Sequence, residues 1–492
     1  GDTALDSATS DASNNVAIGN TAGTALTSGS DSVAVGAGAL ATASTASYNT
    51  AVGMNSLGSA TGASNTAVGR RSLRNTAAGS SNTAVGADAG LSITTGNNNV
   101  AIGFEALSTE DAHGENTAVG YRALKTLNAG ASGLNTAIGY NAALSMTTGI
   151  QNVIIGVQAG DALTDADYNV AVGPYALTSD TQGSKSTALG WGTLVTQNFS
   201  SATDSFNTAI GYNAGYSVTT GIENVLIGGV AGDALTDADF NIAIGVSTLT
   251  QDTKGSKTVA IGGGALNAQN FTSATDTHNV AVGFHAGNDV TTGIKNTMIG
   301  NLSGDKLTDA DLNTAVGYGS LSEDIQGSRS TAIGAFALEA QANSSATDAD
   351  NVGIGVNAGA VMSTGVQNTL IGTLAGDTLT TGSGNVCIGR GADTAANNSV
   401  YSITLGRDVT SIGDYYFTFG VDSSVHRVYN QFTSNASWTR ASDERLKKDI
   451  TTNTDCGLDF INDLRTVTYK FKAPSELDPS MVAYDSSKTE SI

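Results

Sequence analysis

A five-residue motif recurs along most of the chain and constrains its fold more than any other feature. The motif reads "NTAVG" or a close variant such as NVAIG, SVAVG or SITLG, and its final glycine occurs 23 times between Gly19 and Gly406. Successive glycines are usually seventeen positions apart, as Gly139 and Gly156 are. From Gly139 onward the steps run 17, 17, 17 and 21 and then begin again at Gly211, so four coils form a larger repeating unit. A fixed short period predicts a solenoid in which each coil covers the next.

The motif also predicts the geometry of one coil. In Thr136-Ala137-Ile138 the Thr and Ile side chains point to one face of a strand and Ala to the other, and Gly139 supplies a permissive turn. Seventeen residues span about 56 Å of extended chain, which predicts two strands of about five residues and two turns. So thin a coil buries little apolar surface to offset the ordering of its many glycines. We therefore expect several chains to pack around a common axis, in a rod roughly 110 Å long.

Composition and charge limit the classes of partner. The formal charge is −22, and charged residues make up 13% of the chain. Nucleic-acid binding needs clustered Lys and Arg, so we predict no nucleic-acid partner. No apolar run approaches the roughly 20 residues of a membrane helix, so we predict no membrane insertion. Two cysteines, Cys387 and Cys456, cannot form a disulfide framework.

The repeats resemble a known family. The pattern N-[ST]-A-[IV]-G, over about residues 14–406, resembles the head repeats of trimeric autotransporter adhesins and repeats in the tail fibres of bacterial viruses. The resemblance implies a left-handed parallel β-roll with three chains wound together. The expected fold class is therefore all-β: a trimeric parallel β-roll or β-solenoid shaft with coils of about 17 residues, followed by a small α+β C-terminal module. The expected domains are a shaft (1–406), an aromatic-rich terminal β-region (407–441) and a partial intramolecular chaperone domain (442–492).

The aromatic-rich region breaks the repeat. Residues 401–438 contain eight aromatic side chains, and alternation in 416–421 and 425–432 predicts twisted strands. We favour an aromatic core that closes the end of the solenoid. An aromatic platform for carbohydrate is the alternative.

The last part of the chain has ordinary globular composition. Its segment "SDERLKKDI" at 442–450 resembles the start of the intramolecular chaperone domain of endosialidase-type phage tailspikes and many tail fibres, and the resemblance extends over about residues 442–472. The resemblance implies a domain that trimerises, helps the β-structured stalk to fold in register, and then cuts itself off. The chain stops at "DSSKTESI", so we expect the domain to be partial.

Two residues of this segment match the family's catalytic pair. The nucleophilic serine falls on Ser442 and the assisting lysine on Lys447, which implies cleavage between Ala441 and Ser442. A lysine acts as a base only if burial or a neighbouring cation such as Arg445 lowers its pKa. The alternative is structural: Ser442 as a helix N-cap, with solvated lysines beyond it.

A second set of candidate ligands lies in the repeated turns. Carboxylates there could bind Ca²⁺, because hard cations prefer oxygen ligands. The candidates are Asp161, Asp165 and Asp167, repeated as Asp233, Asp237 and Asp239, and in part as Asp305, Asp309 and Asp311. Polar turns that keep the rod soluble are the favoured interpretation, and we expect no other cofactor. The four histidines (His113, His278, His285 and His426) show no metal-ligand spacing.

These features together favour a homotrimeric tail fibre of a bacterial virus. We expect it to assemble in the host cytoplasm and act outside the cell as part of the virion tail. Its expected partners are a host surface receptor, with a glycan as one candidate, and tail or baseplate proteins bound through an N-terminal region that precedes Gly1. We expect no enzyme activity apart from single-turnover serine autoproteolysis. The first alternative is a bacterial trimeric surface adhesin. The second is a polysaccharide-degrading tailspike, which needs paired carboxylates about 5–10 Å apart.

Overall fold

The computed structural model describes residues 3–5 and 12–433 and the backbone of 439–440. The chain divides into two units, Gly1–Ala441 and Ser442–Ile492. The second unit lies outside the described residues, and so do the predicted α+β module, Ser442 and Lys447. All regular secondary structure in the described part is β, as predicted. A search of the described part for a helix that could cross a membrane finds none.

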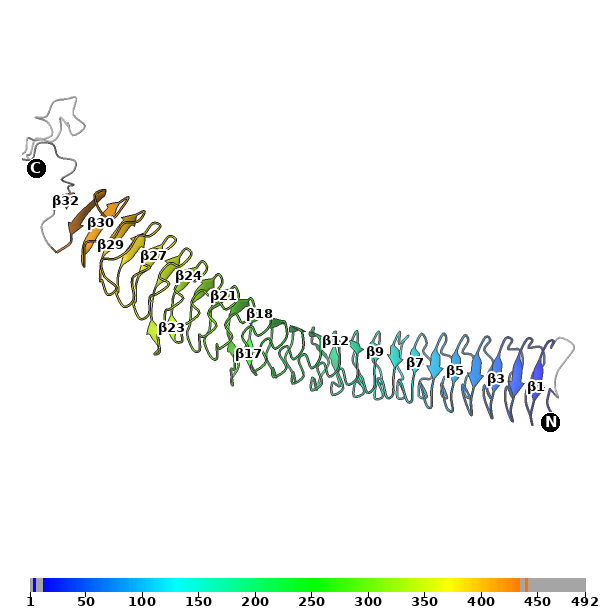
Figure 1. Cartoon of the computed structure of the whole chain (residues 1–492). Coiled ribbons are helices and arrows are strands. Elements are labelled where there is room, and N and C mark those ends of the chain that lie inside the picture. Colours follow the sequence, from blue (N-terminus) through cyan, green and yellow to red (C-terminus); the bar gives the residue numbers. More distant parts are fainter. Residues whose placement is uncertain (1–2, 6–11, 434–438, 441–492) are drawn as a thin grey trace, which may run out of the picture. The chain divides into compact units, whose positions relative to one another are not determined.

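The described chain is a solenoid in which one strand of each coil stacks on the corresponding strand of the next (Figure 1). The main sheet has 26 strands, of which all but β31 and β32 form a parallel ladder of 24. Corresponding residues of neighbouring coils pair directly, as in Val225↔Ile242, Leu226↔Ala243 and Ile227↔Ile244.

The strands of the main sheet are β1 (Val16–Ile18), β2 (Val33–Val35), β3 (Thr50–Val52), β4 (Thr66–Val68), β5 (Thr83–Val85), β6 (Val100–Ile102), β7 (Thr117–Val119), β8 (Thr136–Ile138), β9 (Val153–Ile155), β10 (Val170–Val172), β12 (Thr187–Leu189), β14 (Thr208–Ile210), β15 (Val225–Ile227), β16 (Ile242–Ile244), β18 (Val259–Ile261), β20 (Val280–Val282), β21 (Thr297–Ile299), β22 (Thr314–Val316), β24 (Thr331–Ile333), β26 (Val352–Ile354), β27 (Thr369–Ile371), β28 (Val386–Ile388), β29 (Ile403–Gly406), β30 (Tyr416–Gly420), β31 (Arg427–Gln431) and β32 (Thr439–Arg440). Three two-stranded sheets recur once in each larger unit: β11 (Gly183–Ser184) with β13 (Thr203–Asp204), β17 (Gly255–Ser256) with β19 (Thr275–Asp276), and β23 (Gly327–Ser328) with β25 (Thr347–Asp348).

The expectation of two strands of about five residues per coil was wrong. Most coils contain a single three-residue strand, and turns make up much of the rest. The reason is backbone conformation: in the coil after Gly156, Gln158 (φ 52°), Gly160 (φ 51°) and Tyr168 (φ 60°) all adopt left-handed φ. Left-handed residues cannot continue an extended strand, so the chain turns at each of them.

The core is a narrow column of small side chains. The middle residue of each three-residue strand points inward, and in most strands it is a fully buried Ala, such as Ala243 or Ala260. Larger residues replace it at a few levels, including Leu226, Met298 and Leu370. A buried Leu in the turn after the motif, such as Leu249, packs in the same cluster. The core therefore depends on backbones approaching closely instead of on bulky side chains.

A ladder of buried asparagines precedes the strands. The Oδ1 atom of Asn65 accepts a hydrogen bond from the backbone N–H of Asn82 (2.9 Å), and the Oδ1 atom of Asn82 accepts one from Asn99 in the same way (2.9 Å). The Nδ2 atom of Asn82 donates to the carbonyl of Gly96 (2.8 Å), which lies on the opposite side of the same coil. Each asparagine thus links its own coil to the next and ties the two sides of the coil together.

The ladder is interrupted once in each larger unit, where Ser186, Thr258 and Ser330 replace asparagine. At the first interruption Gln197 replaces the missing amide. Its Nε2 atom donates to Ser186 Oγ (2.9 Å) and Asp180 Oδ2 (2.6 Å), and its Oε1 atom accepts from the Nδ2 atom of Asn207 (2.9 Å). The same buried relay recurs in the later units as Asp252–Gln269–Asn279 and Asp324–Gln341–Asn351.

The parallel ladder ends at β30. The predicted strands in this region are confirmed, since β30 pairs in parallel with β29, and β31 pairs antiparallel with β30. Among the residues that the structure describes, none of the aromatic side chains between 401 and 433 is fully buried, so these rings do not form the expected closed core by themselves. The inward position of β30 belongs to the buried Thr418, whereas Phe419 is 42% exposed. Side chains alternate along a strand, so the rings on either side of Thr418 cannot turn inward.

The motif glycines allow the closest approach between coils. Gly228 has φ +137°, and a Cβ atom built on it would lie 2.2 Å from the carbonyl oxygen of Gly245 in the next coil. Its neighbour Gly229 has no such φ, and a Cβ atom there would meet nothing within 4 Å. Two adjacent glycines therefore differ in both space and backbone conformation.

We predict that Gly228→Ala lowers the free energy of unfolding by at least about 2 kcal/mol, because it adds backbone strain and a steric overlap. Gly229→Ala is the matched control and should change stability by less than about 0.5 kcal/mol. Chemical denaturation followed by circular dichroism would measure both. Equal stability of the two variants would contradict the close approach of the glycine column.

Candidate functional site

The main sheet presents a continuous uncharged and largely apolar surface away from the core. We define the outward face as the residues three and one positions before the motif glycine in the 24 parallel strands, with Gly420 taking the place of that glycine in β30. In these described strands the first column contains only Thr, Val, Ile and, in β30, Phe417. The second contains only Val, Ile, Leu and, in β30, Phe419. Neither column contains a charged or amide side chain.

The outward face is open in the single chain. Residues of its second column that are more than a third exposed include Ile18, Val68, Val85, Ile102, Ile138, Leu189, Ile299, Ile333 and Ile388. Soluble monomers rarely expose contiguous apolar patches larger than a few hundred Å². A face that repeats on every coil exceeds that limit, so it has the character of an interaction surface.

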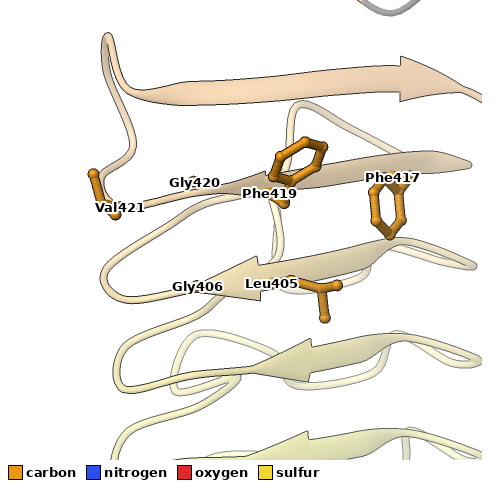
Figure 2. A pocket seen from close by; sticks show the side chains of 6 residues that line it. All are labelled: Leu405, Gly406, Phe417, Phe419, Gly420 and Val421. Carbon is orange, nitrogen blue, oxygen red and sulfur yellow. The ribbon is translucent and has the colours of Figure 1, made fainter. Parts of the chain in front are cut away.

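The two columns end in a shallow apolar hollow on β29 and β30 that is widely open to solvent and has a volume of about 760 Å³ (Figure 2). Its lining residues are Leu405, Gly406, Phe417, Phe419, Gly420 and Val421. The rings of Phe417 and Phe419 lie 5.7 Å apart and are tilted by 53°. From the sequence alone, these phenylalanines were not connected with the repeat. Aligning "FTFG" at 417–420 with motifs such as "TAVG" would have placed them in the two columns.

Aromatic residues also stack along one edge of the coils. Phe104, Tyr121 and Tyr140 each follow a motif glycine, and their rings stack with centroid distances of 5.4 and 5.1 Å. Trp191 and Tyr212 repeat the arrangement at 5.1 Å. Because neighbouring rings cover each other's faces, the stacks stabilise the stacking of coils.

Glu110, Asp111 and His113 form a candidate metal cluster that reasoning from the sequence missed. They offer ligand atoms that all lie within 4.8 Å of one another. Glu110 is fully buried, and burial raises its pKa. Its carboxylate accepts hydrogen bonds from the backbone N–H groups of Asp111, His113 and Ala129 (3.2, 3.2 and 3.3 Å). These bonds explain the buried carboxylate without a metal ion.

The signal for this cluster is a departure from the repeat. Glu110 lies seven residues after its motif glycine, where later units have Asp180, Asp252 and Asp324. His113 lies where those units have a glycine, and Leu127 where they have the relay glutamine. The His113 Nδ1 atom lies 3.4 Å from Glu110 Oε1. The imidazole thus gives the buried carboxylate a polar neighbour, as the glutamine does in the later units, whereas the side chain of Leu127 is apolar.

The predicted calcium ligands make contacts within the protein. Asp167 accepts the backbone N–H of Ile150 (2.8 Å), and Asp239 and Asp311 make the equivalent bonds in their units. The carboxylates of Asp161 and Asp165 accept from the hydroxyls of Thr178 and Thr148 (2.6 Å each), and Asp237 pairs with Lys254 (3.7 Å). In the described residues none of them belongs to a group of three or more potential metal ligands. Calcium binding stays a prediction.

Two aspartates of this set carry a buried oxygen without a hydrogen bond. In Asp233 and Asp305 the Oδ1 atom is buried and has no hydrogen-bond partner. Burial raises the pKa of both carboxyl groups, that of Asp305 to about 6, with Asp289 and Glu323 adding to the effect. The native state therefore favours the protonated form of Asp305. Its contribution to stability should be present below the unfolded pKa of about 4 and be lost as pH rises through about 6.

We predict that Asp305→Asn raises the thermal midpoint relative to the unmodified chain at pH 7–8 but not at pH 4. The difference between the two proteins should grow between about pH 4 and 6 and be constant above that range. Asp309→Asn, in the exposed part of the same turn, controls for the loss of one negative charge. A pH-independent difference for Asp305→Asn would show that this carboxyl group titrates normally.

Comparison with known proteins concerns the second unit. Residues 442–485 match the model of the Peptidase_S74 family, described as "Chaperone of endosialidase". A search of curated proteins finds no match to the chain. The candidate catalytic residues Ser442 and Lys447 fall within the matched segment, although the structure does not describe them. The chain is therefore a β-solenoid that carries a chaperone-of-endosialidase domain at its C-terminal end.

Proposed function

We propose that this protein is the shaft of a homotrimeric tail fibre of a bacterial virus, assembled under the guidance of its C-terminal chaperone domain. A solenoid and a chaperone-of-endosialidase domain fit a tail fibre or tailspike. One observation supports the trimeric shaft in particular: the outward face is uncharged on all 24 parallel coils, and its second column is apolar on every one of them. The shaft would span distance and present a receptor-binding end to the host surface.

The size of the outward face fits self-association. Twenty-four coils at about 4.8 Å, each contributing a width of about 7 Å, give roughly 800 Å² per chain. A stable pairwise interface buries about 800 Å² per partner, and because each chain of a trimer divides its face between two neighbours, side chains that flank the two columns would contribute as well. Around an axis parallel to the rod, each coil would face the same coil of the other chains. Each side chain of the outward face would then lie beside the same side chain of the other chains. Uncharged side chains can do so without repulsion between like charges.

Register is the problem that a chaperone would solve. Successive larger units, such as those that begin at Gly139 and Gly211, have the same length and closely similar outward columns, so chains shifted by one unit would still bring matching columns together. A trimeric clamp at one end of the chain would remove this ambiguity before the shaft folds. In this proposal the C-terminal domain serves assembly and is not needed afterwards.

Removal of the domain would follow from chemistry at Ser442. Lys447, acting as a base, would take the hydroxyl proton, and the Ser442 oxygen would attack the carbonyl carbon of Ala441. The amide C–N bond breaks, an ester forms in its place, and the amine of Ser442 takes up a proton. Water then hydrolyses the ester, which leaves a carboxylate on Ala441 and restores the Ser442 hydroxyl. The reacting groups belong to adjacent residues, so proximity supplies a large effective concentration.

The chaperone match favours a viral fibre over the other two candidates. A surface adhesin would share the solenoid, but the match to a chaperone of endosialidase points to tailspikes and tail fibres. A polysaccharide-degrading tailspike needs paired carboxylates in a groove. The hollow on β29 and β30 is lined by residues without carboxylates. Attachment to tail or baseplate proteins and binding to a host receptor, with a glycan as one candidate, are part of the proposal.

We predict that Ile354→Asp on the outward face prevents stable trimers, because it would place three carboxylates in an apolar interface. The matched control is Val361→Asp in the following turn, where the side chain is 45% exposed and lies outside the two columns. Native mass spectrometry would compare the two proteins. Trimers of normal stability in Ile354→Asp would exclude the outward face as the interface.

We predict that the chain expressed with its natural C-terminus gives trimers whose subunits end at Ala441. Ser442→Ala should assemble but retain the C-terminal segment, because the nucleophile is lost, and Lys447→Ala should slow cleavage at least tenfold. Intact-mass measurement after denaturation would read each product. Cleavage at the same bond in Ser442→Ala would rule out the proposed nucleophile.

A further inference from the structure

We propose that Phe417 and Phe419 form an aromatic clamp with the same residues of the other copies of this chain, and that this clamp holds the three chains together at the end of the shaft. The inference rests on the proposed trimer. It goes further by assigning the hollow on β29 and β30 to a definite occupant, a phenylalanine of a neighbouring copy.

The first argument is the position of the two rings in the repeat. β30 pairs with β29 in the register Ile403↔Phe417 and Leu405↔Phe419, so both rings continue the columns of the outward face. Along the preceding parallel strands these columns contain only β-branched residues and Leu. Both columns change to Phe in the same strand, which is the last of the parallel ladder. Because both outward residues become Phe in one strand, we infer that this strand has a role that the other strands do not have.

The second argument is the shape beside the rings. The hollow of about 760 Å³ lies against Leu405, Phe417 and Phe419, on the same surface as the columns (Figure 2). A neighbouring copy related by an axis along the rod brings its own β29 and β30 to this level. Its phenylalanines are larger than the Thr, Val, Ile and Leu of the other coils, and the open apolar surface at this level is one that such rings could cover.

The third argument is the chemistry of the lining. None of the six lining residues carries a polar side-chain atom. A sugar or a polar peptide would lose hydrogen bonds with water there and gain none from side chains. Aromatic rings bury large apolar areas and favour tilted or edge-to-face contacts with one another. The hollow therefore suits a ring of another copy better than a glycan.

The clamp would matter most after the chaperone domain has left. Phe417 and Phe419 precede the proposed cut after Ala441, so they stay with the shaft. The other coils have similar small side chains (Thr, Val, Ile and Leu) on this face, which resist a relative shift of the chains only weakly. The coil that carries the two phenylalanines would pack well only against the same coil of the other chains. It would therefore slow both the sliding of the chains along one another and their separation.

Subunit exchange tests the clamp. Trimers labelled with heavy isotopes would be mixed with unlabelled trimers, and mixed species would be followed by native mass spectrometry. Phe417→Ile combined with Phe419→Leu gives the last strand the same outward residues as β29. We expect this variant to assemble and to exchange at least tenfold faster than the unmodified chain. Phe432→Leu, which removes another exposed ring of the same region, should leave the rate unchanged.

The outcomes separate the clamp from the trimer. An intact double variant that exchanges at the unmodified rate would overturn the clamp and leave the trimer standing. A monomeric unmodified chain would overturn both.

A cysteine variant covers the case in which the double variant does not fold. Phe419→Cys, in a chain with Cys456→Ser, should be joined to a neighbouring copy by a short bismaleimide and should be protected from a monofunctional maleimide. Cys387 does not interfere, because it is buried and its pKa is raised to about 12. Rapid monofunctional labelling in the assembled trimer, without cross-linking, would mean that the hollow faces solvent and would refute the clamp.

Discussion

Buried asparagine ladders make this fold possible. A coil with one three-residue strand depends on hydrogen bonds to its neighbouring coils, in its turns as well as in its strand, and its core is largely alanine. The Asn82 side chain accepts the backbone N–H of Asn99 in the next coil and donates to the carbonyl of Gly96 across its own coil. Buried polar groups are costly unless they are paired, so each asparagine both satisfies the backbone and fixes the spacing between coils. The close approach of the motif glycines depends on that spacing.

Where the ladder is interrupted, the chain compensates with a longer side chain. Ser186 cannot provide an amide, and Gln197 reaches in from another part of the coil, held by the buried carboxylate of Asp180. The interruption coincides with the long step between motif glycines, so the longer coil and the relay are one structural feature that each larger unit repeats. The coils around Glu110 and His113, which come before the larger units in the chain, differ from this relay. There the ladder is intact, since Asn116 is retained, and Leu127 stands at the position of the relay glutamine.

The sequence was sufficient to predict the solenoid, its period and the alternation that points alanine inward, because these follow from repetition and from the geometry of a strand. It did not reveal the short strands. They depend on left-handed φ at residues such as Gln158 and Tyr168, which are not glycines and carry no compositional signal. The role of Phe417 and Phe419 was missed for another reason. An excess of aromatic residues suggests a core, and only the register with β29 shows that the rings point outward while Thr418 is buried.

Repetition makes the solenoid long, but it also makes its coils similar to one another, so that the chains could align in more than one register. Each coil contacts mainly its neighbours, and the outward face has nearly the same chemistry at every level, so neither the ladder nor the face distinguishes one register of the chains from another. Register must then be set where the repeat ends. The chaperone-of-endosialidase domain lies at that end in sequence, and the phenylalanine strand is the last parallel coil before it. In this proposal the C-terminal domain selects the register of the three chains during folding and is then removed. Phe417 and Phe419 of β30, which stay with the shaft, keep the chains in that register afterwards.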